Sequence, residues 1–362
     1  MNSDELWMRR ALLLAQKGEG RTSPNPLVGA VVVRNGKSIA EGYHAYFGGP
    51  HAEISALRKA GRRAQGARLY VSLEPCSSWG KTPPCVDTVI KSRVRQVIIG
   101  SADPNPANHR KGIRKLKQAG VHVRAGILGK EVARQNETFF KVQQKGYPFV
   151  TLKMAQSLDG KIATKKGESR WISSSAARRF IHRLRDRADA VLVGKNTARL
   201  DDPKLLGTKE KEKPWRVILD PKMELGSRSR FFQGPQLTFV VVSEKRMNRI
   251  SKSSKGQKRI LICVPEKKGR LQLKILLRKL ARLGVNHLLV EGGGETAWSF
   301  IQERLVDRLI WIVAPKIVGG RDAKTSVEGE GIEKLGKAFP LKWEKIYRLG
   351  EDWVLESCLR ES

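Results

Sequence analysis

Short apolar runs and amphipathic stretches alternate along the first 146 residues. Residues 27–33 form an apolar run rich in β-branched side chains, and the Asn35-Gly36 pair that follows is a strong hairpin signal. Between residues 51 and 60 the apolar positions recur at helical spacing instead. By the same criteria, further helices are expected over 6–16, 84–92 and 111–119, and further strands over 38–41, 68–73, 96–100 and 121–125. We therefore expect this half to be an α/β domain in which helices pack on a sheet.

A turn-forming segment, Lys145-Gly146-Tyr147-Pro148, separates this half from the next. Beyond it the pattern predicts strands over 149–155, 190–194, 215–219, 237–242, 259–264, 286–290 and 309–313, a C-terminal pair of strands, and helices over 173–187, 272–282 and 295–304. Polar stretches at 209–214 and 251–257 are expected to be loops. The halves share no repeat, so we expect two different α/β domains, residues 1–146 and 147–362.

The composition is typical of a protein with buried cores and without a membrane span. The chain has 362 residues, 40% of them apolar, and its longest apolar runs are far shorter than a membrane span. Its N-terminal stretch carries Arg9 and Arg10 in the middle and has no small-residue cleavage site, so we interpret it as a helix and not as a signal peptide. The four scattered cysteines are too few for a disulfide scaffold and indicate a reducing compartment. We therefore expect a cytoplasmic protein.

Basic residues outnumber acidic ones by 70 to 35, which gives a formal net charge of +35. The excess is spread over both halves and does not form a basic tail. A spread excess fits a polyanion binder, an enzyme of anionic metabolites or a proteome with a basic bias. Clusters such as 111–117 and 252–259 more often form solvated faces or loops than binding sites. Without a recognition motif, we do not expect a nucleic-acid partner.

One histidine and two cysteines of the first half have the number and the types that a catalytic zinc takes. His51, Cys76 and Cys85 supply three nitrogen or sulfur ligands and leave a fourth position for water. Glu53 lies two residues after His51 at the start of the same predicted helix, so both side chains can face one pocket near its positive end. A carboxylate that is close to the zinc but not a ligand can carry protons from an ionising water to a leaving amine. The sequence therefore predicts one Zn²⁺ and a deaminase with Glu53 as its catalytic residue.

The alternative is a buried histidine, a glutamate in a first helical turn and two unrelated cysteines that fill small apolar spaces. A structural zinc would more often have four side-chain ligands, but this half has only two cysteines and no second histidine at ligand spacing. The joint pattern favours the catalytic zinc. The other two cysteines, Cys263 and Cys358, lie on strand-like segments of the second half and are expected in its core.

The residues of the second half leave its chemistry open. The segment Val290-Glu291-Gly292-Gly293-Gly294-Glu295-Thr296 follows an apolar strand and opens a helix, a place where backbone amides bind phosphate well. It is not the six-residue dinucleotide fingerprint, so a cofactor turn and a plain strand-to-helix turn both fit. Asp201-Asp202-Pro203 is likewise either a paired-carboxylate site or a loop with a helix cap.

The deaminase pattern is part of a wider resemblance. His51-Ala52-Glu53 with Pro75-Cys76 and Cys85 resembles the cytidine deaminase superfamily, but here eight residues separate the cysteines where nucleic-acid editing members have two. This longer loop, with SPNPLVG at 23–29, GYH at 42–44 and DPNP at 103–106, is similar to the deaminase half of the bifunctional riboflavin biosynthesis deaminase/reductase family. The resemblance implies a cytidine-deaminase-like three-layer α/β domain that deaminates 2,5-diamino-6-ribosylamino-4(3H)-pyrimidinone 5′-phosphate. It implies substrate contacts from Asn25, His44, Lys81, Asp103 and Asn105.

The second half is similar to the reductase domain of that family. It carries, in the family's order, KMAQSLDGK at 153–161, ESRWIS at 168–173, RLR at 183–185, DAVLVG at 189–194, NT at 196–197, DDP at 201–203 and EGG at 291–293. The resemblance implies a dihydrofolate-reductase-like α/β domain that reduces the ribosyl group of 5-amino-6-(5-phosphoribosylamino)uracil to ribityl with NADPH. It implies cofactor contacts from Ala155, Trp171, Thr197, Asp201, Gly293, Gly294, Glu295, Thr296, Ala297, Trp298 and Ser299. It implies substrate contacts from Ser169, Arg185, Leu205 and Glu291, of which Arg185 suits a phosphate because its planar fork binds oxyanions bidentately.

Three places depart from the family's usual pattern. Ser78 stands where the family usually has histidine, residues 107–110 read Ala-Asn-His-Arg where small residues and a glycine are usual, and Thr208 stands where arginine is usual. Lys204 or Lys209 could replace that arginine.

Our hypothesis is a multifunctional enzyme, both hydrolase and oxidoreductase, with phosphorylated pyrimidines as its small-molecule partners, no membrane partner and, by the resemblance, a homo-oligomeric state. The alternatives are a family member with one activity, or a polynucleotide or tRNA deaminase with a basic accessory domain.

Overall fold

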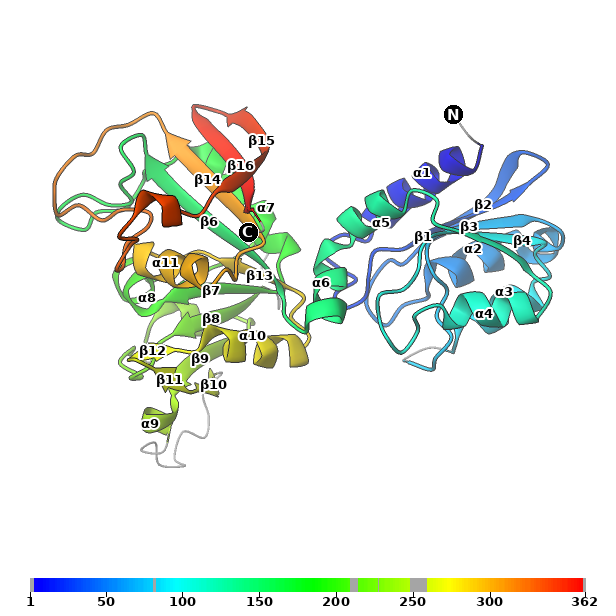
Figure 1. Ribbon diagram of the computed structural model, residues 1–362, viewed down its shortest axis with the longest axis horizontal. Helices are drawn as coiled ribbons and strands as arrows, with labels where there is room; N and C mark the ends of the chain where they lie inside the picture. The colour runs from blue at the N-terminus through cyan, green and yellow to red at the C-terminus, as the bar shows by residue number, and fades with distance from the viewer. Residues whose placement is uncertain (1–2, 81–82, 209–213, 227, 248–258, 361–362) are drawn as a thin grey trace. The chain divides into compact units, whose positions relative to one another are not determined.

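Residues 3–80, 83–208, 214–226, 228–247 and 259–360 are described in a computed structural model of the chain (Figure 1). The chain divides into two units, Met1–Gly146 and Tyr147–Ser362, each with its own sheet and core. No helix among the described residues is both long enough and apolar enough to cross a membrane.

The first unit is built on a five-stranded sheet in the order β2-β1-β3-β4-β5. Its strands are β1 (Gly29–Arg34), β2 (Lys37–Tyr43), β3 (Arg68–Leu73), β4 (Gln96–Ser101) and β5 (His122–Ala125). β1 pairs antiparallel with β2 and with β3, whereas β3, β4 and β5 run parallel. Asn35 and Gly36 both have positive φ in the turn between β1 and β2, which is the backbone that a two-residue hairpin turn favours.

Helices cover both faces of this sheet. They are α1 (Ser3–Gln16), α2 (Ala52–Ala60), the short η1 (Gly61–Ala64), α3 (Cys85–Lys91), α4 (Lys111–Gln118), α5 (Gly129–Gln135) and α6 (Glu137–Lys145). Side chains alternate along β1, because successive residues of a strand point to opposite faces. Ala30 and Val32 share a core with α2, α3 and α4, whereas Val31 and Val33 share one with α1. The predicted three-layer α/β fold is therefore confirmed (Figure 1).

The second unit has a nine-stranded sheet in the order β10-β9-β8-β7-β13-β6-β14-β16-β15. Its strands are β6 (Phe149–Ser157), β7 (Ala190–Gly194), β8 (Trp215–Leu219), β9 (Thr238–Ser243), β10 (Arg259–Val264), β13 (His287–Val290), β14 (Arg308–Ala314), β15 (Leu341–Leu349) and β16 (Asp352–Leu359). All neighbours are parallel except β16, which is antiparallel to β14 and β15. A separate pair, β11 (Glu266–Lys267) and β12 (Arg270–Leu271), is antiparallel.

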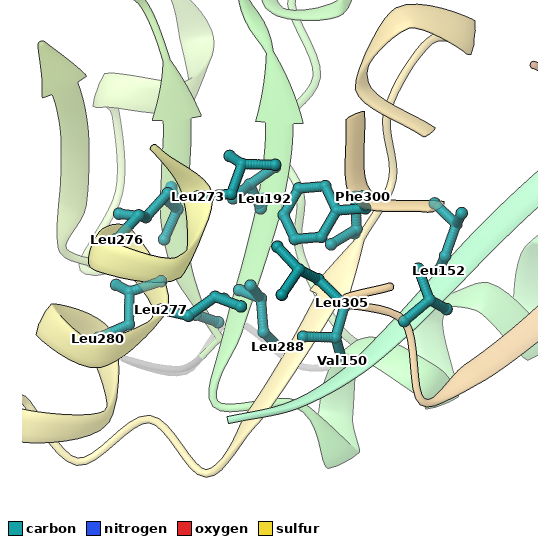
Figure 2. Packing of buried hydrophobic residues seen from close by; sticks show 14 of the residues in the cluster. Val150, Leu152, Leu192, Leu273, Leu276, Leu277, Leu280, Leu288, Phe300 and Leu305 are labelled. Carbon is teal, nitrogen blue, oxygen red and sulfur yellow. The ribbon is translucent and has the colours of Figure 1, made fainter. Parts of the chain in front are cut away.

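This second sheet also lies between two helical layers. The helices and helical turns of the unit are α7 (Ser175–Arg187), α8 (Lys195–Asp201), η2 (Arg230–Phe232), α9 (Glu244–Met247), α10 (Leu273–Arg282), α11 (Gly294–Gln302) and η3 (Leu335–Lys337). α10 buries Leu273, Leu276, Leu277 and Leu280, which recur at the spacing of one helix face. Figure 2 shows these leucines packed with Phe300 of α11 and with side chains of the central strands. α7 and α8 cover the opposite face, in a second cluster.

The structure differs from the predicted elements in several places. The helices α5, α6, α8 and α9 and the β11–β12 pair were not predicted. Asp201 ends α8 and Asp202 is its C-cap with a φ of 38°, so these residues close a helix and do not cap the start of one. Cys263 and Cys358 are partly exposed, so their expected place in the core is wrong: β10 is an edge strand, and β16 lies next to the other edge. Residues 209–213 and 251–257 of the predicted polar loops lie outside the described residues.

Candidate functional sites

Three elements of the first unit bring His51, Cys76 and Cys85 together. His51 is the N-cap of α2, Cys76 follows the end of β3, and Cys85 begins α3. The Nδ1 atom of His51 lies 3.1 Å from the Sγ atom of Cys85 and 3.7 Å from the Sγ atom of Cys76, and all three ligand atoms lie within 4.8 Å of one another. One imidazole nitrogen and two sulfurs are ligands that zinc prefers. Within the described part of the chain, no fourth residue of ligand type joins this group, so it fits a catalytic zinc with an open position.

The electrostatics of Cys76 suit a cation, whereas the hydrogen bond to Cys76 and burial raise the pKa of Cys85. Hydrogen bonds from the Cys85 thiol and from His51 lower the pKa of Cys76. The backbone amide of Cys85 also donates to the Cys76 sulfur at 3.3 Å. Thiolates and not thiols bind metal ions, so this arrangement prepares the sulfur of Cys76 for a metal.

Glu53 lies in the first turn of α2, beside this group. Its side chain is buried, and burial raises its pKa to about 7 despite the favourable charge of His51. Its carboxyl group is also hydrogen-bonded to the Cys85 thiol. A carboxyl group that titrates near neutral pH can both accept and release a proton there.

Asn25 and His44 are fixed on the side of His51. The His44 Nδ1 atom donates to the carbonyl oxygen of Pro50 at 3.0 Å, so its Nε2 atom accepts from the Asn25 side-chain amide at 3.1 Å. The His44 ring lies edge-to-face with the His51 ring, 5.2 Å between centres. Burial lowers the pKa of His44, which keeps it neutral. The structure thus brings two of the predicted substrate residues to the metal group.

Asp103 and Asn105 lie on a loop that is hydrogen-bonded to the residues flanking Cys76. The side-chain oxygen of Asn108 in this loop accepts from the Ser78 hydroxyl at 2.8 Å and from the Ser77 amide at 3.3 Å. Two of the departures from the family pattern, Ser78 and residues 107–110, therefore contact each other. The predicted substrate residue Lys81 lies outside the described residues.

The second unit has a cavity of about 480 Å³ at the carboxyl ends of its central strands. Met154 and Ala155 of β6, Val193 of β7 and residues 291–293 after β13 line it, which is where ligands bind in parallel α/β sheets. The predicted substrate residues Ser169, Arg185, Leu205 and Glu291 all line this cavity. So do the predicted cofactor residues Ala155, Trp171, Thr197, Asp201 and Gly293.

The remaining predicted cofactor residues belong to α11. They are Gly294, Glu295, Thr296, Ala297, Trp298 and Ser299. Ala297 is fully buried and Trp298 packs edge-on against Phe339, so these two side chains face the interior. Gly293 is the N-cap of α11, so the amide-rich, positive end of this helix opens at the cavity. A cavity of this size beside a helix N-terminus fits a phosphate-bearing cofactor such as NADPH.

Glu291 is the centre of a buried cluster of three charges. Its carboxylate accepts from the Nε and Nη2 atoms of Arg185 at 2.6 and 3.0 Å, and from Lys153 Nζ at 2.9 Å. Burial alone would raise the pKa of Glu291, but the charges of Arg185 and Lys153 outweigh it and hold that pKa well below its usual range. The third nitrogen of Arg185, Nη1, donates to the carbonyl oxygen of Leu206 at 3.1 Å. The fork that was expected to bind a phosphate thus binds Glu291 in this structure.

The sequence analysis did not identify Lys153 as a member of this cluster, although Lys153 is the first residue of the reductase-like motif at 153–161. Thr208, the third departure, donates through its amide and hydroxyl to the Asp186 carboxylate at 3.0 and 2.5 Å and does not line the cavity. Lys204 does line it, whereas Lys209 lies outside the described residues. Lys204, one of the two lysines considered as replacements for the usual arginine, therefore lies at the cavity.

Both units resemble known families. Residues 1–101 match the family described as cytidine and deoxycytidylate deaminase zinc-binding region, and residues 148–355 match the family described as RibD C-terminal domain. The riboflavin biosynthesis protein RibD of Aquifex aeolicus (strain VF5) is 42% identical over 354 residues, which cover 97% of each chain. The RibD protein of Escherichia coli (strain K12) is 38% identical over 97% of this chain and 98% of its own.

Solved structures match over the same length. A structure of Acinetobacter baumannii RibD has a TM-score of 0.88 and 34% identity and covers 99% of both chains. A Thermotoga maritima structure, described as a diaminohydroxyphosphoribosylaminopyrimidine deaminase/5-amino-6-(5-phosphoribosylamino)uracil reductase, has a TM-score of 0.85 and 35% identity over 99% of both chains.

Proposed function

The chain belongs to the RibD family of bifunctional riboflavin biosynthesis deaminases and reductases, and from this premise we propose how its residues divide the two reactions. Residues 1–146 deaminate 2,5-diamino-6-ribosylamino-4(3H)-pyrimidinone 5′-phosphate. Residues 147–362 then reduce the ribosyl group of 5-amino-6-(5-phosphoribosylamino)uracil to ribityl. The observation that carries the proposal is the convergence of His51, Cys76 and Cys85 beside the buried Glu53, in the half that matches a zinc-dependent deaminase family.

In the deaminase site, Nδ1 of His51 and the sulfurs of Cys76 and Cys85 would hold one Zn²⁺. Zinc, when bound, supplies the Lewis acidity that ionises water near neutral pH. Glu53 accepts the proton of the attacking water at its carboxylate and delivers it to the departing amino group. A carbon–oxygen bond forms at the ring, the carbon–nitrogen bond breaks, and ammonia leaves.

The remaining deaminase residues bind and orient the substrate. Asn25 is hydrogen-bonded to His44, whose ring contacts the ring of His51. Asp103 and Asn105 supply carboxylate and amide groups that can read ring edges. Lys81 lies between the two zinc cysteines in sequence, and we assign it to the phosphate as a point charge.

In the reductase site, NADPH supplies the hydride. The protein's task is to place the nicotinamide against the sugar carbon. We assign the cofactor to Ala155, Trp171, Thr197, Asp201 and the first turns of α11, and the substrate to Ser169, Arg185, Leu205 and Glu291. The guanidinium group of Arg185 is held by two hydrogen bonds to Glu291, so the part of the cavity wall that these two side chains form is rigid. Arg178 and Lys204 also line the cavity and add positive charge.

Two further proposals concern the protein as a whole. None of the four cysteines forms a disulfide, which supports a reducing, cytoplasmic compartment. A homo-oligomeric state rests on the family resemblance. The match of the second unit to the RibD C-terminal domain family favours the two-reaction proposal over the polynucleotide deaminase alternative.

One experiment tests the division of labour. The purified chain is analysed for zinc and assayed separately for ammonia release from the first pyrimidine and for NADPH oxidation with the second. We expect one zinc per chain and both activities. Cys85→Ala should lose the zinc and the ammonia release and keep the NADPH oxidation. Ammonia release by the zinc-free variant would contradict the proposal, and a wild-type chain with only one activity would establish the single-activity alternative.

A further inference from the structure

The carboxylate of Glu74 lies between the segment that carries Cys76 and the loop that carries Asp103. Glu74 follows β3, and only 4% of the residue is exposed. Its Oε2 atom accepts from the backbone amides of Asp103 at 3.0 Å and Arg110 at 2.9 Å, and its Oε1 atom accepts from the amide of Ile113 at 3.0 Å. One side chain therefore binds three backbone groups of a different segment.

Two of these amides lie at the start of a helix. Arg110 is the N-cap of α4 and Ile113 lies in its first turn, where backbone amides have no partner within the helix. A negative charge is also favourable at this end of a helix. Gly112 shows how closely the two segments approach: a Cβ atom there would lie 2.2 Å from the carbonyl oxygen of Pro75. The start of α4 is thus seated on residues 74 and 75.

The loop that Glu74 holds is stiffened by its own hydrogen bonds. The Asp103 carboxylate accepts from the Asn105 amide at 2.9 Å, and the Asn105 side chain accepts from the Ala107 amide at 2.9 Å. The Nδ1 atom of His109 donates to the carbonyl oxygen of Asp103 at 2.8 Å. Since these bonds link both ends of the loop, Asp103 and Asn105 keep their mutual geometry and shift together if the attachment changes.

A second attachment lies on the other side of Cys76. Asn108 accepts from the amide of Ser77 and the hydroxyl of Ser78. The loop is therefore held both before and after the metal ligand. Of the two attachments, the one at Glu74 has three hydrogen bonds to a carboxylate, and such charge-assisted bonds are the stronger kind.

We propose that Glu74 is a positioning residue of the deaminase site, which fixes the Asp103–Asn105 loop at a set distance from the zinc-binding segment. It touches neither the substrate nor the metal, and it acts through the two residues that read the pyrimidine. The inference rests on the proposed function, because it requires Asp103 and Asn105 to bind substrate.

The test is the steady-state kinetics of Glu74→Gln in the full chain. Glutamine keeps the shape but removes the charge and replaces one acceptor by a donor. We expect KM for the deaminase substrate to rise about tenfold or more, because a charge-assisted hydrogen bond is lost. The effect on kcat should be smaller. Bound zinc and the KM of the reductase should stay at wild-type values. Glu131→Gln, at an exposed glutamate of α5 in the same unit, is the matched control and should change neither KM.

The outcomes separate positioning from a merely structural role. A fall in kcat at unchanged KM, or a loss of bound zinc, would overturn the inference. If Glu74→Gln does not fold, Glu74→Asp decides, because it keeps the charge but shortens the reach to the three amides: a rise in KM of about threefold with zinc retained supports the inference, and an unchanged KM overturns it. A wild-type chain that releases no ammonia would refute the proposed function itself, whereas an active wild type with an unaltered Glu74→Gln KM refutes only this inference.

Discussion

Glu53 and Glu291 are both buried glutamates beside a candidate active site, one in each unit, and their pKa values are shifted in opposite directions. Burial raises the pKa of Glu53 to about 7, since among the protein groups around it only His51 offers a favourable charge. Burial acts on Glu291 in the same sense, but Arg185 and Lys153 reverse the result and hold its pKa below the usual range. The partners, and not the depth of burial, decide what each carboxyl group can do.

The contrast separates two kinds of chemistry. A carboxyl group without a strong partner exchanges protons near neutral pH, as general acid–base catalysis requires. A carboxylate held by two cations stays ionised and serves as a fixed anion that orders the side chains around it. In the proposed division of labour, the deaminase moves protons at Glu53, whereas the reductase receives its hydride from the cofactor and needs no proton exchange at Glu291.

The sharpest test of the contrast is Glu53→Gln. We expect ammonia release to fall by about 10²–10⁴-fold, the usual contribution of a general acid–base group, with zinc retained. The free energy of unfolding should change by less than about 1 kcal/mol, because the amide replaces a carboxyl group that gains little from ionisation. Ammonia release close to the wild-type rate would remove Glu53 from the mechanism. NADPH oxidation by the same preparation is the internal control.

Glu291→Gln should have the opposite profile, with a large loss of stability. It leaves Arg185 and Lys153 buried without their carboxylate, which typically costs about 3–5 kcal/mol. Calorimetry should show a lower melting temperature for the second unit, with the transition of the first unit unchanged. Glu330→Gln is the matched control, since Glu330 pairs with Arg270 at 3.0 Å but is 79% exposed. An equal loss of stability in Glu291→Gln and Glu330→Gln would contradict the expected difference between a buried and an exposed carboxylate.

Acidification should affect the two active sites unequally. Burial raises the pKa of Asp103 to about 6, with smaller contributions from the charges of Glu74 and Cys76. As the pH falls from 7 to 5, Asp103 gains a proton, and at pH 5 only about a tenth of it stays ionised. We expect the deaminase KM to rise up to about tenfold over this range, while Glu291 remains ionised and leaves the reductase KM flat. Zinc must be measured at each pH, because acid also releases metal from cysteine and histidine.

The smallest effect is expected at an exposed ion pair. Arg10 and Glu41 lie 2.7 Å apart, but their side chains are 46% and 28% exposed. Such pairs contribute about 0–1 kcal/mol, so Arg10→Gln should hardly change the unfolding of the first unit in urea. A loss as large as that of Glu291→Gln would mean that burial is not what distinguishes the charged groups of this protein.

The sequence predicts features that depend on residue type and short spacing. The zinc ligands, the helix that begins after His51 and the hairpin at Asn35-Gly36 are of this kind, and the two α/β folds are confirmed. The helices α5, α6 and α8 were missed because their seven to nine residues depend on packing more than on a regular apolar pattern.

Features that join distant segments were not predictable in the same way. Arg185 lies 106 residues before Glu291, and no local pattern shows that its fork binds that carboxylate. The role of Glu74 is hidden for another reason, since its partners are backbone amides, which the sequence does not distinguish. The chemistry of a side chain can be predicted from the sequence, but the groups that it contacts can be identified only from the fold.

The strand order of the second sheet also constrains how this protein is made. β13 pairs with both β6 and β7, although it follows them by more than a hundred and by nearly a hundred residues. A nascent chain leaving the ribosome therefore carries a gap between β6 and β7 until residue 290 has emerged, whereas all five strands of the first unit are complete by residue 125. Such late, non-local pairing slows folding and leaves apolar strand edges open during translation. We therefore expect a chain truncated before β13 to keep the fold of the first unit but to aggregate through the incomplete sheet of the second unit.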